Sequence, residues 1–354
     1  MLNSIHNYSS QIGLLAGDEM RKKSILITGG AGFIGSHLAE EYVKKGYTVK
    51  ILDDFSSGAV NNIRGLLNFK NFKLIRGNVG DKEVVAKAMD GVDIVFHLAA
   101  QIHVDKSIIA PRQTFEVNTF GTLNILDSAL ENDVELVIYA SSSEVYGSAQ
   151  YVPMDEKHPL NPASPYAASK AAADRLCFAY YNTYKLPVVI VRCFNTYGPR
   201  QSDTGYAAAI PKFIRRVMQG LPPIIYGDGK QTRDYMYIKD AVNAYDLVLN
   251  SHENLTGRIV NFGTGQEISI NELANKVISL FGRKGKLKPI HVAPRPGEVK
   301  RLYADISFAK KELGFEPKYD IASGLKEFIE WYKEGRYEEW LAYRSETEHS
   351  DFVR

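Results

Sequence analysis

Tyr166 and Lys170 stand four positions apart in the run SPYAASKAAAD, whose composition predicts a helix. Residues at this spacing share one face of a helix, so we expect the phenol and the ammonium to lie together. A nearby ammonium lowers the pKa of a phenol, which lets Tyr166 act as a base near neutral pH. The pair alone is common on surface helices, so it needs support from other side chains.

That support comes from the apolar run ELVIYASSS, which predicts a strand. The strand ends in the hydroxyls Ser141, Ser142 and Ser143, and Glu144 follows. A hydroxyl can hydrogen-bond a reacting oxygen, and a carboxylate can remove a proton from carbon. With Tyr166 intact beside them, these residues predict an enzyme rather than a redox sensor that has lost its chemistry.

A glycine-rich turn, TGGAGFIG, places Gly29, Gly32 and Gly35 after one predicted strand and at the start of a predicted helix. Glycine suits this position because the turn is tight and its backbone must approach a pyrophosphate closely. The N-terminus of the helix then offers amide groups and a positive dipole to the phosphates. This context predicts a dinucleotide site.

Asp53 and Asp54 end the next predicted strand, at the spacing expected after such a turn. A carboxylate at this place can accept both hydroxyls of the adenosine ribose. It also repels the additional phosphate of NADP. The predicted cofactor is therefore NAD.

With these motifs combined, the chain resembles the extended short-chain dehydrogenase/reductase superfamily over residues 22–337. The resemblance implies that Tyr166 deprotonates a sugar hydroxyl and that Ser142 hydrogen-bonds the reacting oxygen. It also implies that Lys170 binds the nicotinamide ribose and tunes Tyr166.

The same resemblance implies the residues that hold the cofactor. It places Asn118 near the active site, and it puts Asn78 where many members carry an aspartate that faces the adenine. We expect a weaker adenine contact from the amide. The implied cofactor residues are Gly29, Gly32, Phe33, Ile34, Gly35, Asp53, Asp54, Asn78, Val79, Leu98, Ala99, Ala100, Asn118, Tyr166 and Lys170.

Three later segments, FNTYGPRQ, IYGDGKQTRDYMYIKD and RPGE, resemble enzymes that act on nucleotide-linked sugars. By that resemblance Asn195, Arg233 and Arg295 hold the diphosphate and the nucleotide. Two fixed guanidinium groups suit a diphosphate, which agrees with this assignment. We therefore expect a nucleotide-diphosphate sugar as the substrate.

Two segments then favour one chemistry. IHVDKSI (Ile102–Ile108) resembles the corresponding run of sugar-nucleotide 4,6-dehydratases, which typically carry Thr-Asp-Glu before VYG. Here those positions hold Ser142, Ser143 and Glu144, so the base is kept and a serine replaces the acid. Oxidation at carbon 4 acidifies the hydrogen on carbon 5, and Glu144 can remove it before the carbon 6 hydroxyl leaves. The predicted catalytic set is Ser142, Ser143, Glu144, Tyr166 and Lys170.

Other chemistries remain open. A 4-epimerase of a UDP-hexose or a UDP-N-acetylhexosamine shares the cofactor residues but needs no base at carbon 5. UDP-glucuronate decarboxylases also carry the Ser-Glu pair, although their helix around Tyr166 is usually more basic than SPYAASKAAAD. The run EVYGSAQYVPMDEKHPLNPASPYAASK most resembles bacterial dehydratases that make 4-keto-6-deoxy N-acetylamino sugars for surface polysaccharides. We therefore rank dehydration first, epimerisation second and decarboxylation third.

The elements that position these residues alternate between strand and helix. Six apolar runs rich in Val and Ile are separated by helical segments such as 82–89, 111–132 and 165–185. Continuously apolar strands predict an α/β fold, a doubly wound parallel Rossmann sheet covered on both faces, with a smaller mixed α/β substrate-binding domain. Ser269 is expected to cap a helix over 269–281.

We expect four parts along the chain. They are a disordered or non-native extension (1–21), an NAD-binding Rossmann domain (22–195, with 230–265 returning to it), a nucleotide-sugar-binding domain (196–229 and 266–340) and a charged tail (341–354).

Composition excludes several other classes. The net charge of +2 does not indicate a nucleic-acid partner, and no run reaches the roughly 18 apolar residues of a membrane span. The two cysteines, Cys177 and Cys193, cannot build a disulfide framework, and the histidines lack metal-ligand spacing. We expect a cytoplasmic protein without a metal. Family analogy further implies a homodimer joined through the helices over 111–132 and 165–185.

Overall fold

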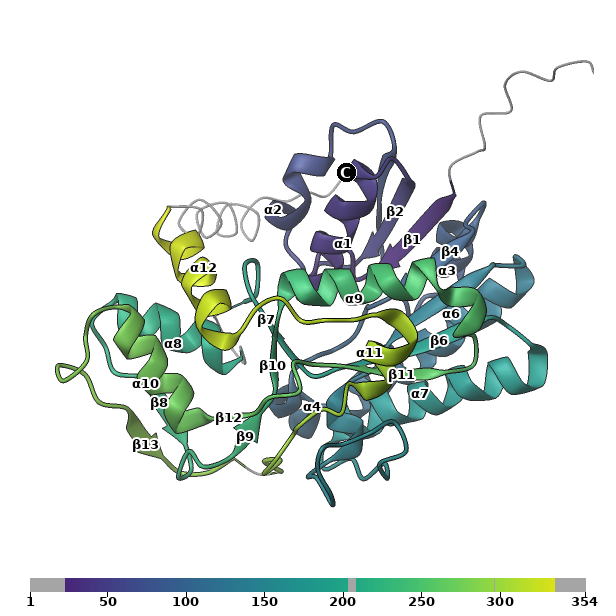
Figure 1. The fold of residues 1–354 in the computed structure, drawn as a ribbon. Helices are drawn as coiled ribbons and strands as arrows, with labels where there is room; N and C mark the ends of the chain where they lie inside the picture. The colour runs from purple at the N-terminus through teal and green to yellow at the C-terminus, as the bar shows by residue number, and fades with distance from the viewer. Residues whose placement is uncertain (1–22, 203–207, 296, 335–354) are drawn as a thin grey trace, which may run out of the picture.

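The computed structural model describes residues 23–202, 208–295 and 297–334, and a seven-stranded parallel sheet forms its centre (Figure 1). The strand order is β11-β6-β5-β4-β1-β2-β3. The predicted doubly wound parallel sheet is therefore confirmed. The strands are β1 (Ser24–Thr28), β2 (Thr48–Asp53), β3 (Phe72–Arg76), β4 (Ile94–His97), β5 (Leu136–Ala140), β6 (Val188–Cys193) and β11 (Ile259–Phe262). The predicted extension over 1–21 and the predicted tail over 341–354 lie outside the described residues.

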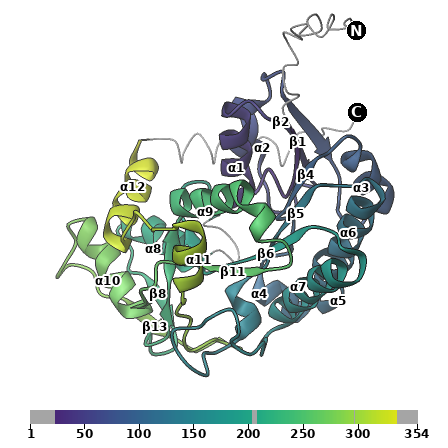
Figure 2. The same cartoon turned by 45° about the vertical axis from the view of Figure 1, so that its right-hand side comes forward.

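Both faces of the sheet are covered, which explains its continuously apolar strands. On β4, Phe96 belongs to one apolar core and Val95 to the other, and on β5 Ile138 and Val137 divide in the same way. Such strands bury every side chain rather than every second one. Helices α1 (Phe33–Lys44) and α9 (Ile238–Asn250) cover the first face, whereas α3 (Lys82–Met89), α6 (Gly121–Glu131) and α7 (Pro165–Tyr184) cover the second (Figure 2).

The segment predicted as one helix over 111–132 is divided in the structure. It comprises α5 (Pro111–Phe115), a π-helical turn (Glu116–Phe120) and α6. The turn carries Asn118, whose buried amide accepts a hydrogen bond from the backbone N–H of Gln101 at 2.7 Å and donates one to Ser169 Oγ at 2.9 Å. Asn118 thus ties the loop after β4 to α7.

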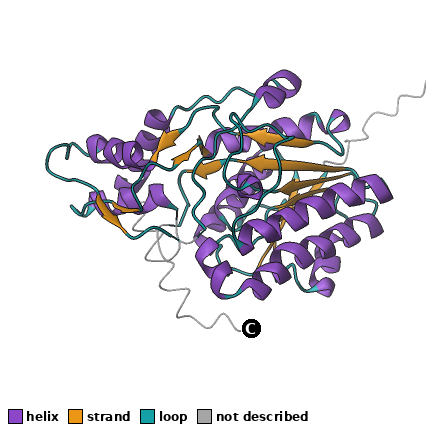
Figure 3. Ribbon diagram, turned by 90° about the horizontal axis from the view of Figure 1, so that it is seen from below, coloured by secondary structure: helices purple, strands orange, loops and turns teal. Residues whose placement is uncertain are grey.

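A smaller mixed α/β part lies beside the sheet, seen from below in Figure 3. Helix α10 packs against two others there, and its predicted cap is confirmed, because Ser269 and Glu272 form a reciprocal capping box. Its helices are α8 (Ala209–Met218), α10 (Ile270–Leu280) and α12 (Ile321–Lys333). Its short strand pairs are β7 (Asn195–Tyr197) with β10 (Tyr235–Tyr237), β8 (Ile224–Tyr226) with β13 (Ile290–Val292), and β9 (Thr232–Arg233) with β12 (Ile268–Ser269).

Short elements complete the described chain. Helix α11 packs on β11, and the ring of Phe315, which follows this helix, meets the ring of Phe262 edge to face at 4.9 Å. None of the helices in the described ranges is long and apolar enough to cross a membrane. The remaining elements are α2 (Val60–Ile63), a 3₁₀ turn (Arg64–Leu66), α4 (Val104–Ile109), a 3₁₀ turn (Ser143–Tyr146), a 3₁₀ turn (His252–Asn254) and α11 (Ser307–Leu313).

Candidate active site

A cavity of about 530 Å³ opens at the carboxyl ends of the sheet strands. The strand order reverses between β1 and β4, and open α/β sheets bind ligands at such a point. Every site residue predicted from the sequence lines this cavity except Asn118, which instead holds the adjacent loop. The fold thus gathers residues that lie as far apart in the chain as Gly29 and Arg295.

The glycine-rich turn forms one end of the cavity. Gly29 has a φ of +69°, and a Cβ on it would lie 2.8 Å from the backbone nitrogen of Ala99. A Cβ on Gly35 would lie 2.2 Å from the carbonyl oxygen of Gly29, so α1 packs directly on the turn. Among the described residues, no side chain caps the N-terminus of α1 at Gly32. The amides there can receive an anion such as a pyrophosphate.

Two carboxylates lie next to this turn. Buried Asp53 accepts hydrogen bonds from the backbone N–H groups of Ala31 at 2.9 Å and Phe55 at 2.8 Å. Burial raises the pKa of Asp53, although these two bonds oppose the shift. Asp54 accepts a bond of 2.6 Å from the amide of Asn78. Asp53 therefore shapes the turn as well as lining the cavity.

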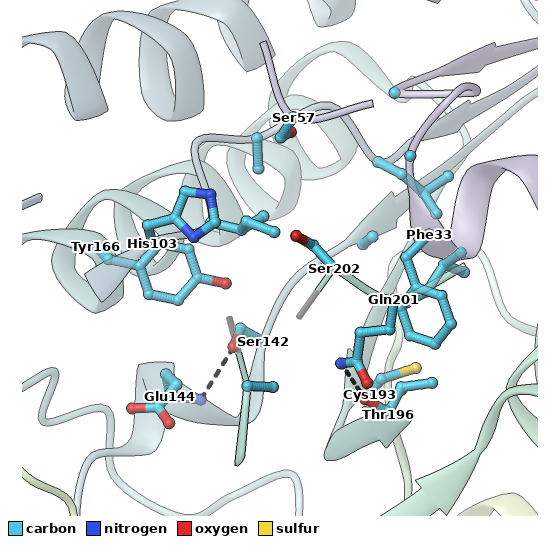
Figure 4. A pocket seen from close by; sticks show the side chains of 18 of the residues that line it. Phe33, Ser57, His103, Ser142, Glu144, Tyr166, Cys193, Thr196, Gln201 and Ser202 are labelled. Atoms are coloured by element: carbon cyan, nitrogen blue, oxygen red, sulfur yellow. Dashed lines mark hydrogen bonds between the residues drawn. The ribbon is translucent and has the colours of Figure 1, made fainter. Parts of the chain in front are cut away.

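The catalytic candidates meet at the centre of the cavity (Figure 4). Ser142 lies two residues after the end of β5 and accepts a hydrogen bond of 3.2 Å from the backbone N–H of Glu144. Burial raises the pKa of Tyr166 to about 12 and the charge of Glu144 adds to this, whereas a hydrogen bond with Ser142 lowers it. Ser142 thus favours the ionised form of the phenol.

Lys170 does not lower the pKa of Tyr166 in this structure, contrary to the argument from helical spacing. Its ammonium donates a hydrogen bond of 2.5 Å to the carbonyl of Ala140 and lies 4.4 Å from the ring centroid of Tyr139. The ammonium group that was expected beside the phenol is therefore bonded to the backbone carbonyl at the end of β5. Burial lowers the pKa of Lys170 itself to about 8.

The Glu144 carboxyl is the second titratable group of the centre. Its pKa is raised by burial and by the charge of Glu298, and Arg233 opposes that shift. Arg233 in turn lies 3.4 Å from a carboxylate oxygen of Glu298. A carboxyl with a raised pKa keeps a proton more readily than a free carboxyl does, which suits a group that must first take up and then release a proton. The buried hydroxyl of Ser143 lies next to it in the chain.

Sequence reasoning missed several residues that line the cavity. Glu298 belongs to the RPGE segment, although only Arg295 was singled out there, and His103 and Asp105 belong to IHVDKSI. Gln201, from FNTYGPRQ, also lines it. The signal for each was its place inside a motif already recognised.

Some polar atoms of the cavity, near the smaller part of the molecule, are available to bind a ligand. Within the described residues, the side-chain oxygens of Asn195 and Gln201 are buried and have no hydrogen-bond partner. The guanidinium of Arg295 lies 3.9 Å from the ring centroid of Tyr226, which holds it in place. No group of three or more His, Cys, Asp or Glu side chains in the described ranges could hold a metal ion.

His97 is buried in β4. Its two ring nitrogens lie 2.7 Å from Thr28 Oγ1 and 2.9 Å from Thr122 Oγ1, and burial lowers its pKa to about 3. It is a neutral histidine with both ring nitrogens hydrogen-bonded.

Comparison with known proteins agrees with this geometry. A family model described as GDP-mannose 4,6 dehydratase matches residues 26–328. The chain belongs to this family. The fold predicted by resemblance to the extended short-chain dehydrogenase/reductase superfamily is likewise confirmed, because the relatives of the family are nucleotide-sugar dehydratases and epimerases of that superfamily.

Relatives with different activities have similar sequence identities to this chain. It is 40% identical to a putative UDP-glucose 4-epimerase of Methanocaldococcus jannaschii, over 87% of this chain and 98% of that protein. It is 39% identical to a UDP-N-acetyl-alpha-D-glucosaminuronate decarboxylase of Bacillus cytotoxicus, over 88% and 98% of the two chains. The crystal structure of DesIV, a dTDP-glucose 4,6-dehydratase of Streptomyces venezuelae solved with NAD, superposes with a TM-score of 0.83 at 34% identity, over 88% and 98% of the chains.

Proposed function

We propose that this protein is an NAD-dependent nucleotide-sugar 4,6-dehydratase, which removes water from carbons 5 and 6 of a hexose. The observation that carries the proposal is the position of Glu144, which lies on the same turn as Ser142 and influences the pKa of Tyr166. A base is needed at carbon 5 for dehydration and has no task in simple epimerisation.

NAD fits the turn end of the cavity. Gly29 and Gly35 leave no room for a side chain, α1 offers its amides to the pyrophosphate, and Asp53 would accept the ribose hydroxyls. When bound, NAD would supply the acceptor for the hydride of carbon 4 and the donor that returns it to carbon 6. DesIV and other structural neighbours were solved with NAD.

The protein's own residues move the protons. Tyr166 accepts the proton of the carbon 4 hydroxyl while Ser142 hydrogen-bonds that oxygen. Glu144 then takes the proton from carbon 5, and the carbon 6 hydroxyl leaves as water after receiving a proton. Because Ser143 carries no acidic proton, we assign that second transfer to Glu144 as well, directly or through water. Reduction at carbon 6 and return of a proton to carbon 5 complete a 4-keto-6-deoxy sugar.

The cations of the cavity favour dehydration over decarboxylation. The Lys and Arg side chains among its described lining residues are Lys170, Arg200, Arg233 and Arg295. Lys170 is bonded to a backbone carbonyl and Arg200 to Glu40, and we assign Arg295 and Arg233, which also pairs with Glu298, to the two phosphates. No cation of this set is then left for a uronate carboxylate.

We further propose that the protein is a cytoplasmic homodimer that acts in surface polysaccharide biosynthesis. An exposed apolar face on the π-helical turn, α6 and α7 supports the dimer, since exposed patches of this kind mark association surfaces. The side chains of this face are Phe120, Leu130, Phe178 and Tyr184.

One experiment separates dehydration from the alternatives. Candidate UDP, dTDP and GDP sugars are incubated with the purified protein in heavy water without added NAD, and NMR identifies the products. We expect a 4-keto-6-deoxy sugar with deuterium at carbon 5. Interconversion of gluco and galacto sugars without exchange would establish the epimerase instead. Loss of carbon 6 from a UDP-uronate would establish the decarboxylase.

A further inference from the structure

A buried ion pair lies behind the catalytic turn and outside the cavity. Arg192 on β6 and Asp174 on α7 are fully buried, and two parallel hydrogen bonds of 2.8 and 2.9 Å join them. Burial opposes ionisation of the carboxyl, but the guanidinium holds the pKa of Asp174 below its usual range. Replacing a buried ion pair with apolar residues is often neutral for stability, so stability alone gives little reason to keep it.

The ion pair contacts the chain on both sides of the turn. Ser141 Oγ donates a hydrogen bond of 2.6 Å to Asp174, and Arg192 Nη1 donates one of 2.9 Å to the hydroxyl of Tyr146. The guanidinium also lies 4.8 Å from the ring centroid of Tyr146, whose hydroxyl donates onward to Asn261 Oδ1 at 2.7 Å. Each of these bonds is buried or partly buried.

These contacts bracket the catalytic residues. Ser141 immediately precedes Ser142, and Tyr146 comes two residues after Glu144. The turn between them is also held by backbone bonds, from Glu144 N–H to Ser142 Oγ at 3.2 Å and from Asn161 N–H to the carbonyl of Val145 at 3.1 Å. The side chains of Ser141 and Tyr146 are the links that join this turn to the buried ion pair.

The same ion pair is attached to the helix that carries the base. Asp174 lies four residues after Lys170 and eight after Tyr166 on α7, so the three side chains share one face. We propose that the Arg192–Asp174 pair is a positioning device, which sets the turn of Ser142 and Glu144 against Tyr166. This inference rests on the proposed roles of those residues.

Tyr146→Phe tests the inference with the loss of one oxygen atom. The variant keeps the ring over the guanidinium and removes the bonds to Arg192 and Asn261. We expect kcat to fall about 10- to 100-fold with KM for the sugar unchanged, because a displacement of about 1 Å costs as much as 100-fold. The hydrogen bond from Ser142 lowers the pKa of Tyr166, so the acid limb of the pH profile should move to higher pH. Arg192→Lys should show the same defects.

Tyr180→Phe is the matched control. Tyr180 lies on the same helix, and its buried hydroxyl donates a 2.5 Å bond to Asp127, away from the turn. We expect a lower thermal unfolding midpoint with unchanged kcat and pH profile. Hydride transfer is followed in a single turnover by the absorbance of NADH, since dehydratases, epimerases and decarboxylases share this step. Slowed transfer in Tyr146→Phe therefore supports the positioning role even where the product shows that dehydration is wrong.

Two results would overturn the inference. The first is a folded, NAD-binding Tyr146→Phe protein with the hydride-transfer rate and pH profile of the wild type. The second is a Tyr180→Phe protein that loses as much of its rate, and shifts its pH profile as far, as Tyr146→Phe.

Discussion

Removing the hydroxyl of Ser142 should make hydride transfer depend more strongly on pH. In the structure the pKa of Tyr166 is about 12, and the hydrogen bond with Ser142 is the interaction that lowers it. At pH 8 only about one molecule in ten thousand then carries the phenolate before ligands bind. Any group that stabilises the phenolate therefore contributes directly to the rate.

The size of the effect follows from the bond that is lost. A hydrogen bond to a charged group contributes about 1.5–3 kcal/mol. At about 1.4 kcal/mol for each pKa unit, Ser142→Ala should raise the pKa of Tyr166 by about 1–2 units. Well below that pKa, the rate should therefore fall about 10- to 100-fold. The deficit should shrink as the pH approaches the pKa, because the phenol then ionises without help.

The assay is a single turnover in which NADH absorbance reports oxidation at carbon 4 across a pH series. Ser143→Ala is the matched control, since it removes the neighbouring buried hydroxyl while the bond to the phenol comes from Ser142. Its profile for this first step should match the wild type. A Ser142→Ala deficit that stays constant with pH, or an equal shift in Ser143→Ala, would refute this reasoning.

Two further predictions concern the cofactor and the assembly. Asp53→Ala removes two hydrogen bonds from backbone N–H groups to a buried carboxylate, so the free energy of unfolding should fall by about 3–6 kcal/mol. NAD affinity should fall as well, and calorimetry that finds it unchanged would contradict the ribose assignment. Phe120→Asp combined with Phe178→Asp places two charges on the exposed apolar face and should convert the proposed dimer to a monomer. A wild type that is already monomeric by light scattering at micromolar concentration would contradict the dimer.

Local sequence signals predicted the framework of this molecule well. The continuously apolar strands indicated a sheet buried on both faces. The structure gives the reason, because the neighbouring residues Phe96 and Val95 belong to apolar cores on opposite faces of the sheet. The cap at Ser269 could be read because a side-chain cap depends only on residues three positions apart. The helix over 111–132 was predicted without its π-helical turn, because that turn depends on Asn118 reaching Gln101 and Ser169 elsewhere in the fold.

The sequence predicted which residues line the site better than it predicted the hydrogen bonds that those residues make. Spacing on α7 put Lys170 on the same face as Tyr166, yet the ammonium bonds to the carbonyl of Ala140, whose position depends on the packing of β5 against α7. Burial also raises the pKa of Tyr166, and burial is a property of the folded molecule. The Arg192–Asp174 pair gave no sequence signal, since its partners come from one strand and one helix that only the fold brings together.

The central claim is that Glu144 removes the proton from carbon 5, and Glu144→Gln in heavy water tests it most directly. Glutamine has nearly the same shape, so the fold, NAD binding and oxidation at carbon 4 should survive. Loss of a positioned base should slow deoxy-sugar formation and deuterium incorporation at carbon 5 by about 10²- to 10⁴-fold, while the bound NAD is still reduced by the sugar. A Glu144→Gln protein that forms the deoxy sugar and exchanges carbon 5 as fast as the wild type would contradict the claim.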